Sequence, residues 1–285
     1  MAERPELPRW LSQGLADVPG DDAWLAPREA AYLAGMRLPK RRGEFRLGRW
    51  TAKRGIAQWL GRSCPEMRAI LVDRAPDGAP APFVDGRPAD LSLTMTDRAD
   101  QAVCLVGPAG TALGCDLELV EPRSDAFVAD YFTEPEQQLV AAEGRGDARD
   151  LVANLIWCGK ESALKVLRTG LRRSTLSVEV SFPAAPAVEG WAPIRVRAVE
   201  GAVFPGWWQR FGAFVLTVAA AGPFAPPLPL VEPPGLATAA PAHSWLGRGI
   251  TRHLTYRETA AALGGKKRDW RKAAPAVLHR LPGFF

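Results

Sequence analysis

Apolar residues recur at two different spacings along this chain, and these spacings predict a mixture of helices and strands. Residues 40–60 carry the clearest helical stripe, because inward positions recur at steps of three and four residues. The members of this stripe are Phe45, Gly48, Ala52, Ile56 and Trp59. Residues 112–119 show the other spacing, since every second residue is apolar, as in a strand with one buried face.

The same patterns continue on both sides of residue 112 and predict an α+β fold. We expect further helices at 28–37, 125–131, 134–143 and 149–168, and strands at 68–73, 91–96, 101–107, 175–182, 193–200 and 211–219. Residues 76–82 are rich in glycine and proline and are expected to form a loop. Strand pairs and helices thus follow in the same order twice, which predicts two similar halves.

The repeated element order divides the body into an N-terminal subdomain at residues 1–111 and a C-terminal subdomain at residues 112–220. Composition sets apart a tail at residues 221–285. The tail begins with residues 221–242, which contain seven prolines and are expected to form an extended linker. Residues 243–285 carry nine lysines and arginines, with a helix expected at 255–263. Two interpretations of this basic segment stay open: a mobile appendage, or a docking segment for an acidic partner.

The overall composition is that of an ordinary globular protein. The 285 residues suffice for one substantial core or two small ones, and 47% of them are apolar. No stretch approaches about 18 uninterrupted apolar residues, so we expect no membrane span. Residues 1–20 lack the apolar core of a signal peptide. The four cysteines have no C-x-x-C spacing, which favours buried thiols in a reducing cytoplasm over a zinc site.

The net charge of +5 at pH 7 comes from the tail. Residues 1–220 carry 27 Lys and Arg against 28 Asp and Glu, whereas residues 221–285 carry 9 against 3. This distribution argues against a nucleic-acid-binding function.

Four charged residues stand at spacings that suit a metal and phosphate site. Asp116 and Glu118 project from one face of a strand, because i and i+2 share a face. Glu161 and Lys165 lie one turn apart on one face of a helix. Mg²⁺ prefers oxygen ligands and takes a few carboxylates together with substrate phosphates. Each pair alone is more commonly a solvated face or a surface ion pair, so the combination carries the prediction.

A basic stripe follows another face of the helix expected at 40–60. Its members are Arg42, Arg46, Arg49 and Lys53. Such a stripe is either a solvated helix face or a wall that binds phosphate, and the residues alone leave both interpretations open.

Two acidic motifs and two weaker segments carry a family resemblance. Gly114, Asp116 and Glu118 form a G-x-D-x-E motif, and residues 157–165 form a W-x-x-K-E-S-x-x-K motif. Residues 131–136 are similar to an F-F-x-x-x-E segment, and residues 40–49 to a basic, G-R-containing helix. With these motifs, residues 20–220 resemble the Sfp-type 4′-phosphopantetheinyl transferases. The resemblance implies two pseudo-symmetric subdomains with the active site in the cleft between them, in a monomer.

The resemblance also implies a reaction. The phosphopantetheine arm of coenzyme A is moved to a serine of an acyl or peptidyl carrier protein, and adenosine 3′,5′-bisphosphate leaves. Whether the carrier serves fatty acid, polyketide or nonribosomal peptide synthesis stays open. Charge neutralisation and positioning suit this chemistry, because phosphoryl-type transfer needs little covalent help from the protein.

Each implied role falls on a particular residue. By the resemblance, Asp116, Glu118 and Glu161 hold Mg²⁺ on the pyrophosphate, and Lys165 stabilises charge on the attacked phosphate. Lys160 would contact coenzyme A. Glu161 would also be the general base for the serine, directly or through water, since all three histidines lie beyond residue 242.

The coenzyme A site is where the chain departs from the family. The resemblance favours a phosphate wall of Arg42, Arg49 and Lys53. Thr96 and Asp97 stand where many members have a Ser-His pair whose histidine contacts a coenzyme A phosphate. A carboxylate at that place supports a second hypothesis: a non-transferring relative that binds or otherwise processes a carrier protein or thioester in the same cleft.

Overall fold

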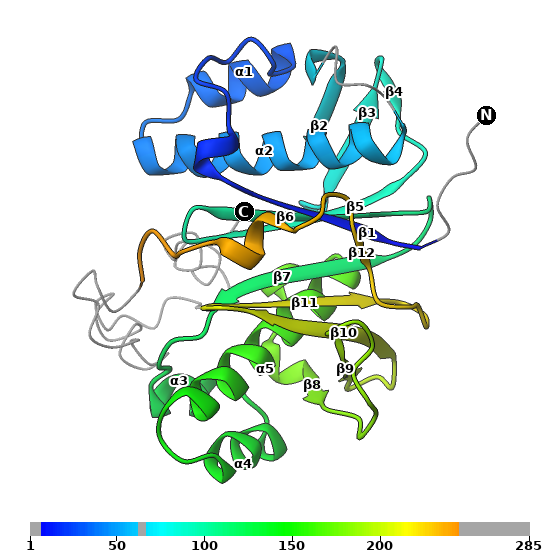
Figure 1. Ribbon diagram of the computed structural model, residues 1–285. Coiled ribbons are helices and arrows are strands. Elements are labelled where there is room, and N and C mark those ends of the chain that lie inside the picture. Colours follow the sequence, from blue (N-terminus) through cyan, green and yellow to red (C-terminus); the bar gives the residue numbers. More distant parts are fainter. Residues whose placement is uncertain (1–6, 62–66, 245–285) are drawn as a thin grey trace, which may run out of the picture.

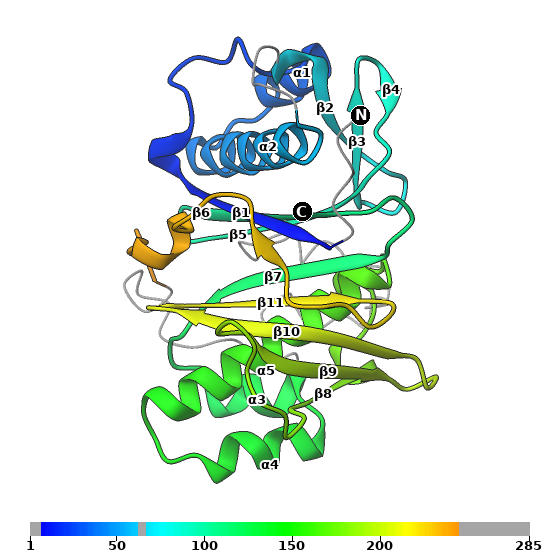
Figure 2. The ribbon, with the colours of Figure 1, turned by 45° about the vertical axis from the view of Figure 1, so that its right-hand side comes forward.

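The computed structural model describes residues 7–61 and 67–244, which form two large β-sheets lying one above the other between two groups of helices (Figures 1 and 2). Its helix and strand content confirms the predicted α+β class. The helix expected at 255–263 lies outside the described residues, as do Cys64 and most of the basic tail. No helix in the described part of the chain is long and apolar enough to cross a membrane.

The first large sheet is built mainly from the N-terminal half and has the strand order β12-β1-β6-β5. The long strands pair antiparallel, whereas the short β12 runs parallel to β1. A separate three-stranded sheet has the order β2-β3-β4. The bounds of these strands are Arg9–Gly14 (β1), Ile70–Arg74 (β2), Pro80–Val84 (β3), Arg87–Pro88 (β4), Ser92–Arg98 (β5), Gln101–Gly107 (β6) and Leu228–Pro229 (β12).

The second large sheet belongs to the C-terminal half and has the order β7-β11-β10-β9-β8, antiparallel throughout. Its strands are Leu113–Leu119 (β7), Val178–Ser181 (β8), Ala192–Ala198 (β9), Val203–Phe211 (β10) and Phe214–Ala220 (β11). Strands β1 and β10 were not predicted, and the expected loop at 76–82 was partly wrong, because β3 begins at Pro80.

All five helices expected within the described residues are present. They are Pro27–Ala34 (α1), Pro39–Trp59 (α2), Asp125–Tyr131 (α3), Glu134–Ala142 (α4) and Asp147–Val166 (α5). Proline occupies the first turn of α2, where its missing N–H removes no helical bond. Helix α5 begins directly after Gly146, whose φ of 123° strongly favours glycine.

Three groups of buried apolar side chains join the layers. Ile56 of α2 packs against the outer face of the first sheet, and Ile156 of α5 packs against the outer face of the second. Leu105 and Leu216 belong to the third group, which lies between the two sheets. Burying a side chain of this size stabilises the fold by about 1.5–3 kcal/mol. The edges of the sheets therefore lie in fixed positions relative to each other.

The edge strands β5 and β7 come together where the two sheets meet. Strand β5 ends the first sheet and β7 begins the second, and the two strands are in contact. The Thr96 hydroxyl donates to Asp116 Oδ1 at 3.0 Å, and Arg98 Nε donates to Glu118 Oε2 at 3.0 Å. The predicted carboxylates thus lie at the junction between the two halves.

Each half contains the same kind of buried ion-pair cluster. Lys53 of α2 pairs with Glu29 of α1 at 2.5 Å, and Lys160 of α5 pairs with Glu136 of α4 at 2.6 Å. Each glutamate also accepts the N–H at the start of its own helix and one N–H from a strand. Each lysine donates to two backbone carbonyls. This correspondence supports two similar halves, although pseudo-symmetry itself stays a prediction.

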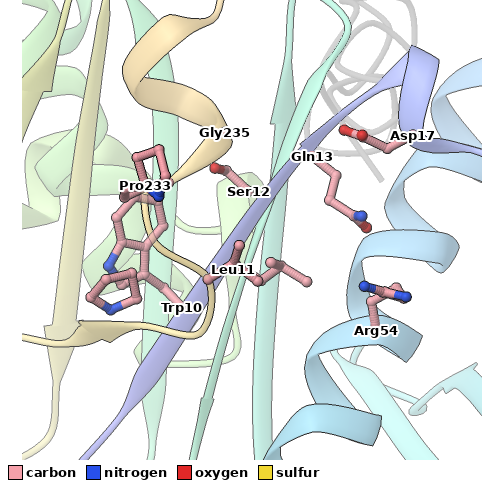
Figure 3. Close-up of a pocket in the computed structure, with 11 residues that line it drawn as sticks. Trp10, Leu11, Ser12, Gln13, Asp17, Arg54, Pro233 and Gly235 are labelled. Atoms are coloured by element: carbon pink, nitrogen blue, oxygen red, sulfur yellow. The ribbon is translucent and has the colours of Figure 1, made fainter. Parts of the chain in front are cut away.

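The proline-rich segment 221–242 is extended, but it is docked on the first half and does not form a free linker. Its strand β12 lies beside β1, and Leu236 is fully buried, with its N–H donating to Ser12 Oγ at 2.8 Å. Proline suits this edge position because no outward N–H is needed there. A pocket of about 250 Å³ lies between this segment, β1 and Arg54 of α2 (Figure 3). It lies on the other side of β6 from β5, away from the carboxylates.

Candidate active site

Close contact between β7 and α5 brings the two acidic motifs together. Gly114 of β7 lies directly under α5, and a Cβ atom there would be 1.9 Å from the Ser162 carbonyl oxygen. Glycine is therefore required for this approach. On α5, Ser162 Oγ and Thr217 Oγ1 share a hydrogen bond of 2.6 Å, which fixes the helix against the sheet.

Asp116 is the buried centre of the cluster. Its Oδ1 atom accepts hydrogen bonds from Thr96 at 3.0 Å and from Lys165 at 2.9 Å. Its Oδ2 atom is buried and has no hydrogen-bond partner among the described residues. Burial raises the pKa of this carboxyl, and repulsion from Glu118 adds to the rise, while Lys165 opposes it. Asp116 therefore has a buried oxygen atom that is available to bind a cation.

Lys165 and Glu161 lie one turn apart on α5 and face Asp116. Lys165 Nζ also donates to the Cys115 carbonyl at 2.8 Å. Burial alone would lower the pKa of Lys165, but the charges of Asp116, Cys115 and Glu161 raise it. The pKa of Glu161 rises well above its ordinary value, first through burial and then through repulsion by Asp116. The predicted catalytic pair thus shares one electrostatic cluster with Asp116.

Glu118 has different surroundings. Its Oε2 atom lies 3.0 Å from Arg98 Nε and 3.1 Å from the Arg123 guanidinium. Burial would raise the pKa of Glu118, but the two arginines outweigh it and lower the pKa. Arg98 also pairs with Glu121 at 2.7 Å, and Arg123 Nε donates to Asn154 Oδ1 at 2.7 Å. Sequence reasoning missed Arg123, Glu121 and Asn154, because no fixed spacing links them to Glu118.

Asp97 lies at the end of β5 beside α2. Its pKa is raised to about 7, first by burial and then by the neighbouring Glu44 charge, whereas Lys165 and Arg41 oppose the rise. Thr96, which was predicted to contact coenzyme A, donates a hydrogen bond from its hydroxyl to Asp116. Asp97 thus adds a further carboxyl close to the cluster, at the position where the resemblance implies a histidine.

Most side chains of the basic stripe of α2 contact other parts of the protein. They are therefore not available to bind phosphate, as the predicted phosphate wall would require. Arg42 donates to the Leu33 carbonyl at 2.5 Å and so ties α2 to α1. Arg49 lies over the Phe45 ring at 4.7 Å, with its side chain only 14% exposed. Lys53 is fully buried in its cluster with Glu29. A helical spacing alone does not distinguish a stripe that faces ligand from one that faces another helix.

Lys160 is also in the interior, contrary to the predicted contact with coenzyme A. Its side chain has no exposed surface, and its ammonium is surrounded by Glu136 and the carbonyls of Thr175 and Val178. Burial lowers the pKa of Lys160, although the Glu136 charge opposes the change. Its role in the structure is to hold α5, α4 and β8 together.

We predict that Lys160→Ala lowers stability strongly. The substitution leaves the Glu136 carboxylate buried without its cation, and breaking a buried pair in this way costs about 3–5 kcal/mol. Urea unfolding measures the loss. Arg173→Ala is the control, because it removes a surface ion pair with Glu200 and should hardly change the stability. Unchanged stability together with weaker coenzyme A binding would restore Lys160 as a ligand.

The donor set fits a divalent cation at Asp116 and Glu161, but it does not fit Glu118 as a ligand. Asp116 has a buried oxygen without a partner, and a cation would relieve the repulsion that raises the pKa of Glu161. The Glu118 oxygen already receives two arginines. Within residues 7–61 and 67–244, no three His, Cys, Asp or Glu side chains form a ready metal-binding group. Two protein carboxylates are enough for Mg²⁺ when a substrate phosphate completes its coordination.

Comparison with protein families places both acidic motifs in one known group. Residues 112–198 match the family model of the 4′-phosphopantetheinyl transferase superfamily. The resemblance carried by the motifs is therefore confirmed at the level of the superfamily, whose members are transferases. No curated protein matches the sequence.

Solved structures are similar to part of the chain, among them the crystal structure of the Thermotoga maritima holo-[acyl-carrier-protein] synthase. It is 17% identical, and the match covers 42% of this chain and 79% of that chain. The TM-score is 0.28. With so low a value, this likeness carries no argument about fold or function.

Proposed function

We propose that this protein transfers the 4′-phosphopantetheine group of coenzyme A to a serine of an acyl or peptidyl carrier protein, with Mg²⁺. The carrying observation is the cluster of Asp116, Glu161 and Lys165 at the junction of the two halves, within the segment that matches the superfamily. In this proposal the enzyme is a cytoplasmic monomer whose subdomains are residues 1–111 and 112–220. The tail beyond them aids the approach of an acidic carrier.

The residues of the cluster have distinct roles in the proposal. Asp116 and Glu161 hold Mg²⁺, which when bound neutralises charge on the pyrophosphate. The serine oxygen attacks the phosphorus next to the pantetheine arm, and the bond to adenosine 3′,5′-bisphosphate breaks. Glu161 accepts the serine proton, directly or through water, as the family resemblance implies. Lys165 stabilises the charge on the attacked phosphate.

The coenzyme A nucleotide lies in this proposal beside Thr96 and Asp97, at the β5 edge. Helix α2 packs beside this edge. Its residues Arg42, Arg49 and Lys53 hold it in place by contacts within the first half. This assignment differs from the phosphate wall expected from the stripe. Among the cations predicted to bind coenzyme A (Arg42, Arg49, Lys53, Lys160 and Lys165), Lys165 is the one that pairs with Asp116.

Release of adenosine 3′,5′-bisphosphate tests the proposed function. The full chain is incubated with coenzyme A, Mg²⁺ and an apo carrier protein, and the nucleotide is quantified by chromatography. We expect release that requires the carrier serine, with a carrier in which that serine is alanine as the control. Release at the same rate from the alanine carrier would indicate hydrolysis of coenzyme A and contradict the proposal.

A second function is supported by the surroundings of Asp97. This carboxyl lies near Glu44 and Asp116, which together disfavour a bound phosphate. The alternative is a non-transferring relative that binds a carrier protein or processes a thioester in the same cleft.

Substitution of Asp97 separates these two functions. For a transferase weakened at its phosphate contact, Asp97→His removes repulsion and adds a donor, so coenzyme A should bind roughly tenfold more tightly after solvent screening. Titration calorimetry with and without Mg²⁺ measures the change. Unchanged or weaker binding would reject the weakened contact and favour the non-transferring relative.

A further inference from the structure

Arg98 connects the two halves at the candidate site. It extends from β5 of the first half to two carboxylates of the second: Glu118 on β7 at 3.0 Å, and Glu121 just beyond β7 at 2.7 Å. The Arg98 side chain is only 10% exposed, and those of Glu118 and Glu121 are 13% and 8% exposed. An ion pair this far from solvent is screened little, and removal of one partner leaves the other as an uncompensated buried charge.

The second half supports the same group from the other side. Arg123 lies 3.1 Å from Glu118 and is only 5% exposed. Asn154 of α5 accepts from Arg123 Nε at 2.7 Å and donates to the Glu121 carbonyl at 2.7 Å. The network therefore runs from β5 through Glu118 to α5, the helix that carries Glu161 and Lys165.

Two bonds link β5 to β7 at neighbouring positions. Thr96 donates to Asp116, and two residues further along each strand Arg98 donates to Glu118. The two contacts therefore have the same register. A shift of β5 would move both contacts together. The position of Asp116 relative to α5 is thus coupled to the pair formed by Arg98.

We propose that Arg98 is a positioning residue that clamps the two halves at the active site, with Glu118 as its anchor and not a metal ligand. This inference rests on the proposed function, since it assigns the cation to Asp116 and Glu161. The contacts agree with it: Glu118 Oε2 already receives Arg98 and Arg123, whereas Asp116 Oδ2 has no hydrogen-bond partner among the described residues.

Thermal unfolding of the full chain in EDTA tests the clamp without any metal. Glu118→Gln should lower Tm by about 5 °C or more, because Arg98 and Arg123 lose their buried anion. Asp116→Asn should leave Tm unchanged or raise it, because a repelled carboxylate is removed. If Glu118 were a metal ligand only, Glu118→Gln would be as stable as the native chain or more stable, and this result would overturn the proposal.

Two further variants show whether the effect belongs to this pair. Arg98→Gln should also lower Tm, and the Arg98→Gln, Glu118→Gln double variant should lose clearly less than the sum of the two single losses. Arg168→Gln is the matched control, because Arg168 pairs with Asp77 of the other half at an exposed position. Its Tm should change by less than about 2 °C. Additive losses at Arg98 and Glu118 would contradict the clamp.

Metal binding supplies a second readout that is independent of activity. Mn²⁺ binding with coenzyme A present, followed by electron paramagnetic resonance, should change less than about threefold in Glu118→Gln and weaken at least about tenfold in Asp116→Asn. Equal loss in both variants would return Glu118 to the metal site and overturn the proposal. Absence of Mn²⁺ binding in the native chain would contradict the proposed function instead, while the unfolding results in EDTA would still decide the clamp.

Discussion

Asp116→Asn should abolish transfer while the protein stays folded. The substitution keeps the shape of the side chain but removes the charge that faces the proposed Mg²⁺ position. Loss of such a group is expected to reduce kcat/KM by about a thousandfold or more. Stability should be retained or increased, because burial already raises the pKa of Asp116 and disfavours its charged form.

Initial rates at several Mg²⁺ concentrations, together with Tm, test this expectation. Glu143→Gln is the matched control, since Glu143 is exposed at the end of α4. Its rate should equal that of the native chain. Full activity of Asp116→Asn at ordinary Mg²⁺ would contradict the assignment of Asp116 as a metal ligand. A large decrease in Tm would show that its role is structural.

Lys165→Ala should lower kcat by about a hundredfold and change KM less than about threefold. Lys165 Nζ lies 2.9 Å from Asp116 and 2.8 Å from the Cys115 carbonyl, so it is held at the centre of the cluster. A cation fixed there acts on charge that develops during transfer more than on the bound ground state.

Steady-state kinetics with coenzyme A as the varied substrate separate the two parameters. Lys165→Arg keeps the charge and should recover part of the lost kcat. A variant in which only KM rises would make Lys165 a binding residue and leave the catalytic role without support.

The long elements of the fold could be predicted because their patterns are strong. The apolar stripe predicted helix α2 and the alternation predicted strand β7, and both elements are present, although β7 is buried on both faces. Strand β1 was missed because neighbouring residues Trp10 and Leu11 are both buried, on opposite faces, which removes the alternation. Strand β10 contains Pro205 and Gly206, which are rare in strands.

The candidate site was predictable only where local spacing determines position. The pairs Asp116–Glu118 and Glu161–Lys165 follow from strand and helix geometry. Whether Lys160 faces a cleft or the interior depends on Glu136, which lies on another helix. In the same way, the partner of Glu118 is set by the packing of β5 against β7. Such long-range pairings leave no periodic signal in a single sequence.

The intact mass of an apo carrier protein, measured after incubation with this chain, coenzyme A and Mg²⁺, tests the central claim most directly. The proposed function predicts a gain of one phosphopantetheine group on the carrier serine, which EDTA and Asp116→Asn both prevent. An unmodified carrier under conditions where the chain is folded and binds coenzyme A would contradict the transfer reaction.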